Sequence, residues 1–157
     1  MRERTTREGL IEAAVHLFHE RGFNATSVQD IVSEAGVPKG TFYNYFDSKE
    51  ALAIAASDVS YPRFMSLLVL EASTSPTLRL RQYFRAVSKE LRQFEYRRGC
   101  LVGNFASEIT SATPALKQRV TEHLDDATSR MSVVIEQGQK AGDIRADIPP
   151  WISRGSC

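Results

Sequence analysis

Two helix-start signals lie close together at the beginning of the chain, and they restrict its fold more than any other feature. Thr5 with Glu8, and Ser27 with Asp30, each place a hydroxyl residue three positions before an acidic one, which is the pattern of a capping box. After each pair, apolar residues recur at intervals of three and four, as on the buried face of an α-helix. Gly36 then ends the second helix soon after its cap. The chain therefore begins with one helix of ordinary length and a second, much shorter one.

A third helix, shorter still, is predicted directly after this glycine. The first helix is expected over residues 6–21 and stops before Gly22, and Pro38 suits the first turn of the third. Phe42 and Phe46 are four residues apart, so both face inward on the same side of that third helix. Two short helices joined by a tight glycine turn form a helix-turn-helix.

Helical periodicity continues beyond this motif, and no period-two strand pattern is present. Asp47 or Ser48 can cap a fourth helix, which Pro62 should interrupt. Residues 71–76 form a predicted loop, and Pro114 opens the last long helix. In the fifth helix, apolar residues spaced four, three, four, three predict a buried seam, and they are Leu80, Phe84, Val87, Leu91 and Phe94.

The predicted fold is therefore all-α. A three-helix helix-turn-helix head over residues 1–48 is followed by a helical ligand-binding and dimerisation bundle over residues 49–157, and the fourth helix connects the two. No apolar run is long enough for a membrane span, and the start of the chain lacks a secretory signal, so we expect a cytoplasmic protein that does not enter a membrane.

Composition excludes little else. The 157 residues are 42% hydrophobic and 25% charged, with a net charge of +1. The first fifty residues hold six basic and eight acidic side chains, a net of −2, so DNA binding must be argued from the placement of cations and not from bulk charge. The sequence offers no nucleophile with a base, no phosphate loop and no metal set, so we expect neither an enzyme nor a cofactor. His16, His19 and His123 are interpreted as surface histidines.

The predicted third helix has the side chains that a DNA major groove would accept. With the two phenylalanines turned inward, the outer side carries Lys39, Gly40, Thr41, Tyr43, Asn44 and Tyr45. Base edges are read by side-chain hydrogen bonds, and phosphates are held by cations and hydroxyls. Lys49 occupies the first turn of the fourth helix, where a cation is disfavoured unless an anion such as a phosphate lies opposite. Each residue alone is also compatible with an ordinary surface.

Residues 6–52 resemble the DNA-binding domain of the TetR family of transcriptional regulators. The segments that carry the resemblance are "RGFNATSVQDI", "AGVPKGTFYNYF" and "SKEAL". The resemblance implies DNA contacts by Lys39, Thr41, Tyr43, Asn44 and Tyr45, with Asn44 directed to base edges and Tyr43, Tyr45 and Lys49 to phosphates. Thr26 or Ser27 would meet a further phosphate. It also implies a homodimer that reads a palindromic operator in double-stranded DNA, represses without ligand and is released when a small molecule enters the bundle.

Candidates for ligand contact lie in the bundle. The large apolar or aromatic ones are Tyr61, Phe64, Met65, Tyr83, Phe84, Phe94, Phe105 and Met131, although a helical core needs such residues as well. Asn104 is the polar candidate. Four cations on one face of the fifth helix are expected to be a solvated surface, with an anionic ligand as the lesser alternative, and they are Arg81, Arg85, Lys89 and Arg92. Arg2, Arg4 and Arg7 either touch DNA or form a solvated arm.

Cys100 is a second kind of candidate. A position at the start of the sixth helix, close to Arg97 and Arg98, would depress the pKa of its thiol and make it reactive. The segment "RRGCLVGN" is similar to a TetR subgroup in which a cysteine at this place is linked to sensing reactive species. The alternative is a buried, inert cysteine.

The end of the sequence departs from the family pattern. Members of the family continue through two further helices that pair across the dimer, whereas "WISRGSC" shows no amphipathic period. The alternative to a working regulator is therefore a truncated remnant that binds small molecules or dimerises unproductively. Light scattering separates the two, because a strict monomer favours the remnant.

Overall fold

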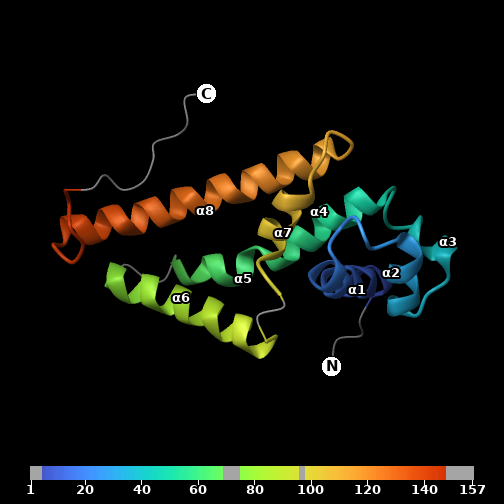
Figure 1. Cartoon of the computed structure of the whole chain (residues 1–157), viewed down its shortest axis with the longest axis horizontal. Helices are drawn as coiled ribbons and strands as arrows, with labels where there is room; N and C mark the ends of the chain where they lie inside the picture. The colour runs from blue at the N-terminus through green and yellow to red at the C-terminus, as the bar shows by residue number, and fades with distance from the viewer. Residues whose placement is uncertain (1–4, 69–74, 96–97, 148–157) are drawn as a thin grey trace.

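The computed structural model describes residues 5–68, 75–95 and 98–147, and all regular structure in them is helical. The head comprises α1 (Thr6–Arg21), α2 (Val28–Ala35) and α3 (Lys39–Phe42). The bundle comprises α4 (Lys49–Ser60), α5 (Pro62–Met65), the 3-10 turn η1 (Ser66–Leu68), α6 (Pro76–Gln93), α7 (Leu101–Glu108) and α8 (Pro114–Lys140). The molecule is elongated, with the head at one end and the far ends of α6 and α8 at the other (Figure 1). The predicted all-α head and bundle are confirmed.

Local capping signals produced the predicted boundaries. Thr5 and Ser27 each accept a hydrogen bond from the backbone of the third helical residue, and the acidic side chain there bonds back, so both capping boxes form. Gly36 ends α2 in the left-handed conformation, with φ 69°, which glycine adopts without steric cost.

The connecting helix begins in the head and ends in the bundle. Ser48 caps α4 by accepting from the backbone of Ala51 at 3.0 Å, and the helix stops at Ser60, before Pro62 opens α5. The predicted interruption at this proline is therefore present. Glu50 in the first turn of α4 accepts from the backbone N–H of Leu116 at 2.9 Å and so caps the start of α8.

One apolar core joins the head to α7 and the beginning of α8. At its centre Phe18, Phe23 and Phe105 lie with ring centroids 5.4 to 6.1 Å apart in tilted and edge-to-face arrangements. Since these rings come from α1, the turn after α1 and α7, the head is packed directly against the bundle.

A second, smaller core lies further along the bundle. Met65, Leu68 and Val134 form its buried centre, and Tyr61, Leu80, Tyr83, Ala127 and Met131 pack around them. The contributing elements are the α4–α5–η1 segment, α6 and α8, which lie side by side in Figure 1.

Part of the predicted apolar seam is not buried. Phe84 is 58% exposed, so the expectation that this residue lies in the buried seam is wrong. Arg79, Gln82 and Tyr83 occupy the inward side of α6 instead. Most of the predicted loop (residues 71–74) and the ending from residue 148 onward lie outside the described residues. Among the described helices, none has the length and apolar character needed to cross a lipid bilayer.

Candidate functional site

Two buried aromatic side chains anchor the segment predicted to read DNA to the core of the head. Phe42 is fully buried and Phe46 is nearly so, with ring centroids 6.0 Å apart. The backbone N–H groups of Tyr45 and Phe46 both donate to the carbonyl of Phe42 at 3.0 Å. The helix proper ends at Phe42, so residues 43–45 continue it as a tight turn, which is shorter than the helix that the sequence predicted.

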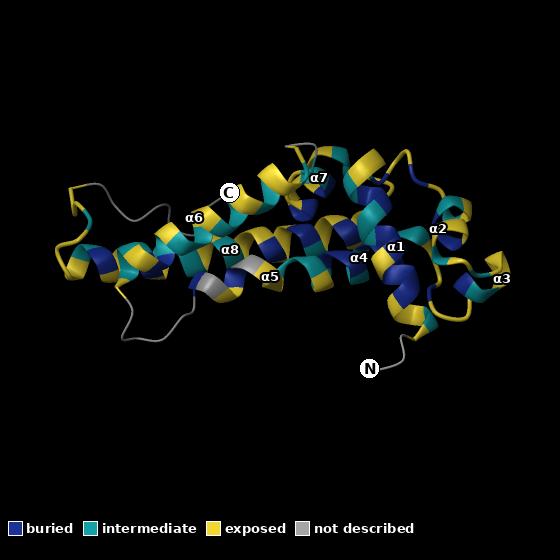
Figure 2. Ribbon diagram, turned by 90° about the horizontal axis from the view of Figure 1, so that it is seen from below, coloured by how far each residue is buried: buried dark blue, intermediate teal, exposed yellow. Residues whose placement is uncertain are grey.

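The outer side of this segment is exposed, as predicted. Tyr43 is 56% and Tyr45 is 44% exposed, and Lys39, Gly40 and Asn44 are exposed as well. The segment lies at the extreme end of the molecule, away from the bundle (Figure 2). A DNA duplex can therefore approach it without meeting α6 or α8. Thr41, also predicted to contact DNA, is half-buried at its edge.

The two hydroxyl residues at the start of α2 are placed differently from each other. Ser27 is exposed, and its hydroxyl donates to the carboxylate of Asp30 at 2.6 Å, which lowers the pKa of that carboxyl. Thr26 is buried, and its hydroxyl donates to the carbonyl of Gly22 at 2.7 Å. Of the two residues predicted to meet a phosphate, only Ser27 is therefore exposed, and Thr26 is a structural residue of the turn.

Lys49 is also turned inward, contrary to its predicted direction toward phosphate. Its ammonium donates to the carbonyls of Phe23 at 2.7 Å and Thr26 at 2.9 Å, and it lies 4.2 Å from the centroid of the Phe23 ring. Partial burial lowers the pKa of Lys49, and the nearby carboxylate of Glu108 opposes that shift. Carbonyl oxygens, and not a phosphate, therefore compensate the charge of Lys49 at the start of α4. They belong to residues 22–27 between α1 and α2, which we call the α1–α2 turn.

Glu108, at the end of α7, holds the same turn from the bundle. Its carboxylate accepts from the backbone N–H groups of Phe23 at 3.1 Å and Asn24 at 2.8 Å. The approach is close because Gly22 has no side chain: a Cβ placed there would lie 2.3 Å from Oε1 of Glu108. Gly22 also has φ 81°, a conformation that favours glycine. No motif or spacing in the sequence singles out Glu108.

The predicted ligand residues separate into groups. Tyr61, Met65, Tyr83 and Met131 meet in the second core. Phe105 belongs to the core between head and bundle, and Phe84 lies outside, so neither joins them.

The remaining ligand candidates lie elsewhere. Phe94 packs under the guanidinium of Arg98, 4.1 Å from its ring centroid, beside an open groove of about 460 Å³ next to the end of α1. Asn104 is half-buried within α7, where its side-chain oxygen lies against Gly99. The side chain of Phe64 lies outside what the structure describes.

A polar network connects α4 to α8 beside the second core. The ring of Tyr61 stacks on His123 with centroids 4.2 Å apart, and its hydroxyl donates to Asp126 at 2.7 Å. Burial, with the Asp126 contact, raises the pKa of Tyr61. His123 is buried, which corrects its assignment to the surface, and its Nε2 lies 3.1 Å from Asp58. Burial and the neighbouring Arg119 lower the pKa of His123, so its neutral form is favoured.

Cys100 is exposed and free, immediately before the first residue of α7. The expectation of a buried cysteine is therefore wrong, and the reactivity of the thiol stays a prediction. The guanidinium of Arg98 lies 3.7 Å from the carboxylate of Glu20 and covers the ring of Phe94. Arg97 lies outside the described residues. Burial, with a smaller effect of Cys100, raises the pKa of Tyr83, which places this tyrosine near the cysteine.

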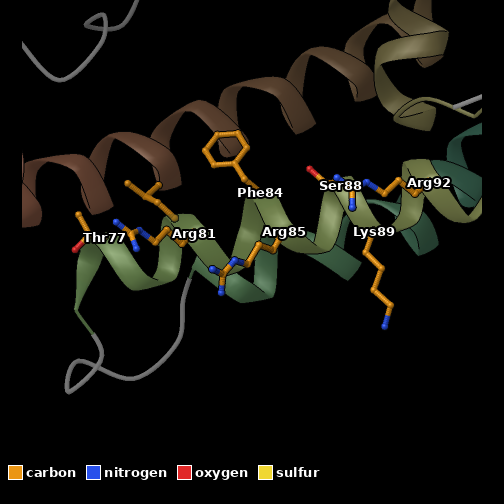
Figure 3. A pocket seen from close by; sticks show the side chains of 8 residues that line it. Thr77, Arg81, Phe84, Arg85, Ser88, Lys89 and Arg92 are labelled. Carbon is orange, nitrogen blue, oxygen red and sulfur yellow. The ribbon is translucent and has the colours of Figure 1, made fainter.

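Four of the basic residues of α6 form a solvated face, as expected. An open groove of about 730 Å³ runs along one side of this helix, and its lining includes Leu80, Phe84 and the cations Arg81, Arg85, Lys89 and Arg92 (Figure 3). The four cations are exposed. Within the described residues, no three His, Cys, Asp or Glu side chains are grouped so as to hold a metal ion.

An exposed, aromatic-anchored helix-turn-helix at one end of a helical bundle defines a class of DNA-binding regulators. Residues 10–56 match the family described as "Bacterial regulatory proteins, tetR family", and residues 76–151 match one described as "Tetracyclin repressor-like, C-terminal domain". The protein belongs to the TetR family and is a DNA-binding transcriptional regulator.

Individual relatives agree with this assignment. The chain is 36% identical over 149 residues to the HTH-type transcriptional repressor DhaR of Mycobacterium sp. (strain GP1), covering 92% of this chain and 72% of DhaR. It is 30% identical over 146 residues to the transcriptional regulator AcuR of Cereibacter sphaeroides, covering 91% and 67%. The crystal structure of regulatory protein TetR from Rhodobacter sphaeroides matches with a TM-score of 0.84 at 30% identity, covering 92% and 78%.

Proposed function

We propose that the protein is a repressor that binds a palindromic operator as a homodimer and is released by a small-molecule ligand or by modification of Cys100. The observation that carries the proposal is the outward presentation of Tyr43, Asn44 and Tyr45 on a segment pinned by buried Phe42. The relative DhaR is described as a transcriptional repressor, which supports the sign of the regulation. The rival interpretation as a non-regulating remnant has no comparable support.

The exposed groups divide by chemistry into phosphate and base contacts. Lys39, Tyr43 and Tyr45 offer cationic or hydroxyl donors suited to phosphates, and Ser27 can add one if its hydroxyl turns away from Asp30. The amide of Asn44 can make two hydrogen bonds to an adenine edge. Thr41 and Gly40 border them, and the open space around the Cα of Gly40 permits close approach of the duplex. Thr26 and Lys49 support this surface from inside.

Selection of bound sequences from random DNA tests the proposal first. We expect a palindrome whose half-sites are about one helical turn, roughly 10 base pairs, apart. Light scattering on the same sample should give the mass of a dimer. Binding that shows salt sensitivity but yields no motif would contradict the proposal.

Two substitutions separate base contacts from phosphate contacts. Asn44→Ala should weaken operator binding by about 1–3 kcal/mol and relax the sequence preference at one position of each half-site. Lys39→Ala should weaken binding to all sequences equally and reduce the salt slope by about 1 for each head. Lys89→Ala removes an exposed cation of the bundle and is the matched control. If Asn44→Ala lowered the affinity for operator and for random DNA equally, Asn44 would not contact a base.

The short helix α7 supplies a path from the bundle to the head. Cys100 precedes its first residue, and Glu108, its last, holds the α1–α2 turn that leads into α2. Eight residues of helix are about 12 Å long. A shift of α7 caused at Cys100 therefore reaches the helix-turn-helix through one rigid element.

Alkylation of Cys100 tests this route. In a Cys157→Ser background, N-ethylmaleimide should label Cys100 and weaken operator binding at least about tenfold, a typical size for coupling between sites. The same reagent should leave Cys100→Ser protein unchanged. Full labelling without loss of operator affinity would exclude the cysteine route and leave release by a bound ligand.

A further inference from the structure

A buried positive charge lies in the bundle without a negative partner among the described residues. Arg79 of α6 is only 7% exposed. Its guanidinium donates to the carbonyl of Leu68 at 3.4 Å and to the side-chain oxygen of Gln137, both of which are uncharged. Its Nε is buried and has no acceptor. In the part of the chain that the structure describes, no carboxylate lies within ion-pair distance of this guanidinium.

The neighbouring inward positions of α6 also have unused hydrogen-bonding groups. Gln82, three residues from Arg79, has a buried side-chain oxygen without a donor. Tyr83, four residues from Arg79, makes no hydrogen bond through its hydroxyl within the described residues, and burial raises its pKa, so it remains a neutral donor. Residues three and four apart share one face of a helix. Donors and an acceptor therefore gather on one side of the second core.

A guanidinium in this position is costly for the protein to keep unpaired. Arginine does not lose its proton within the range of protein pKa values, so it cannot become neutral as a buried lysine can. A buried charge is ordinarily paired with an opposite charge, and two neutral acceptors with one open N–H group compensate only part of its lost hydration. An anion bound at Nε would supply what is missing.

We propose that Arg79 anchors the negative group of the effector, and that the effector is a small organic carboxylate with an apolar body. This inference rests on the proposed function, since it names the ligand class of the regulated bundle. A planar guanidinium matches a carboxylate through paired hydrogen bonds. The adjoining side chains of Met65, Leu68 and Val134 are apolar and suit the rest of such a molecule. Methionine is unbranched and flexible, so Met65 can move to admit it.

The exposed cations of α6 are poorer candidates for the same role. Arg81, Arg85 and Lys89 are exposed to solvent beside the open groove (Figure 3). Because water hydrates them, they gain little from an added anion. Arg79 differs from them in burial and in its open donor, although Arg81 and Arg85 are arginines too.

Thermal unfolding of the full chain without DNA tests the inference. Sodium butyrate and sodium octanoate should raise the melting temperature by about 5 °C or more at a hundredfold excess over Kd, against sodium chloride of equal ionic strength. Arg79→Met should weaken this binding at least about tenfold while its own melting temperature without ligand stays equal to that of the wild type or rises. Arg81→Met is the control and should bind the carboxylates normally.

Three outcomes would overturn the inference. One is carboxylate binding that Arg79→Met leaves intact. Another is an equal rise in melting temperature with inorganic phosphate and with butyrate, which would show that the ligand needs a negative charge but no apolar part. The third is a loss of stability in Arg79→Met that equals the loss in Glu71→Gln and does not increase when the two substitutions are combined. That result would assign the guanidinium to an internal ion pair. Arg79→Lys serves if the methionine variant does not fold. Carboxylate binding is measured without DNA, so its result stands on its own even if the protein proves not to be a repressor.

Discussion

Gly22→Ala is expected to lower the free energy of unfolding by about 3 kcal/mol and to weaken operator binding at least about tenfold. The backbone at Gly22 has φ 81° and ψ 174°, a region that costs other residues about 1–3 kcal/mol. The new Cβ would also lie 2.3 Å from a carboxylate oxygen of Glu108, so the carboxylate must leave the N–H groups of Phe23 and Asn24. Hydrogen bonds to a charged group contribute about 1.5–3 kcal/mol. Urea unfolding and operator titration measure both effects.

A double-mutant cycle separates the two causes. Glu108→Ala removes the colliding carboxylate, so Gly22→Ala should cost less in that background than in the wild type. Gly142→Ala is the matched control, because Gly142 has φ 79° but no atom near the position of a Cβ. Its substitution carries the backbone cost alone. Equal losses for Gly22→Ala and Gly142→Ala would show that Glu108 does not hold the α1–α2 turn.

The parts of this fold that the sequence predicted are those whose causes are local. The caps at Thr5 and Ser27 act over three residues, and Gly36 acts through its own backbone. Pro62 breaks a helix because it lacks an N–H group. None of these effects depends on what another part of the chain does, so the boundaries of α1 and α2 followed from residue order.

The side-chain assignments that were wrong depend on partners distant in the sequence. Lys49 was expected to face a phosphate, but its acceptors are carbonyls more than twenty residues earlier. His123 is buried because it meets Asp58, 65 residues away. Phe84 fits a four-three spacing, yet the spacing cannot say which side of α6 the rest of the bundle covers. Periodicity identifies a possible face, and packing decides whether it is used.

The candidate sites show the same division. The exposed row from Lys39 to Tyr45 could be predicted because two inward phenylalanines determine which side faces out. Glu108 and Arg79 could not, since one charged residue in a helix gives no pattern to detect. Glu108 acts on backbone groups 84 and 85 residues away, and Arg79 is notable because no carboxylate of the described residues pairs with it.

Phe42→Ala should lower the free energy of unfolding by about 3–5 kcal/mol and abolish specific operator binding. The ring is fully buried, with Phe46 at 6.0 Å and Tyr43 at 5.1 Å between centroids. Removing a buried phenylalanine ring typically costs about that much, because contacts are lost and a cavity remains. The effect on DNA should be larger than on stability, since α3 has only four residues and no helix that short is stable without packing.

Phe84→Ala is the matched control, because it removes the same ring from a site that is 58% exposed. It should cost less than about 1 kcal/mol and leave operator affinity unchanged. Phe42→Leu keeps an apolar side chain in the pocket and should retain part of both the stability and the binding. If Phe42→Ala protein, kept folded at low temperature, still selects the wild-type operator sequence, then the segment from Lys39 to Tyr45 does not depend on its buried ring and is not the element that reads DNA.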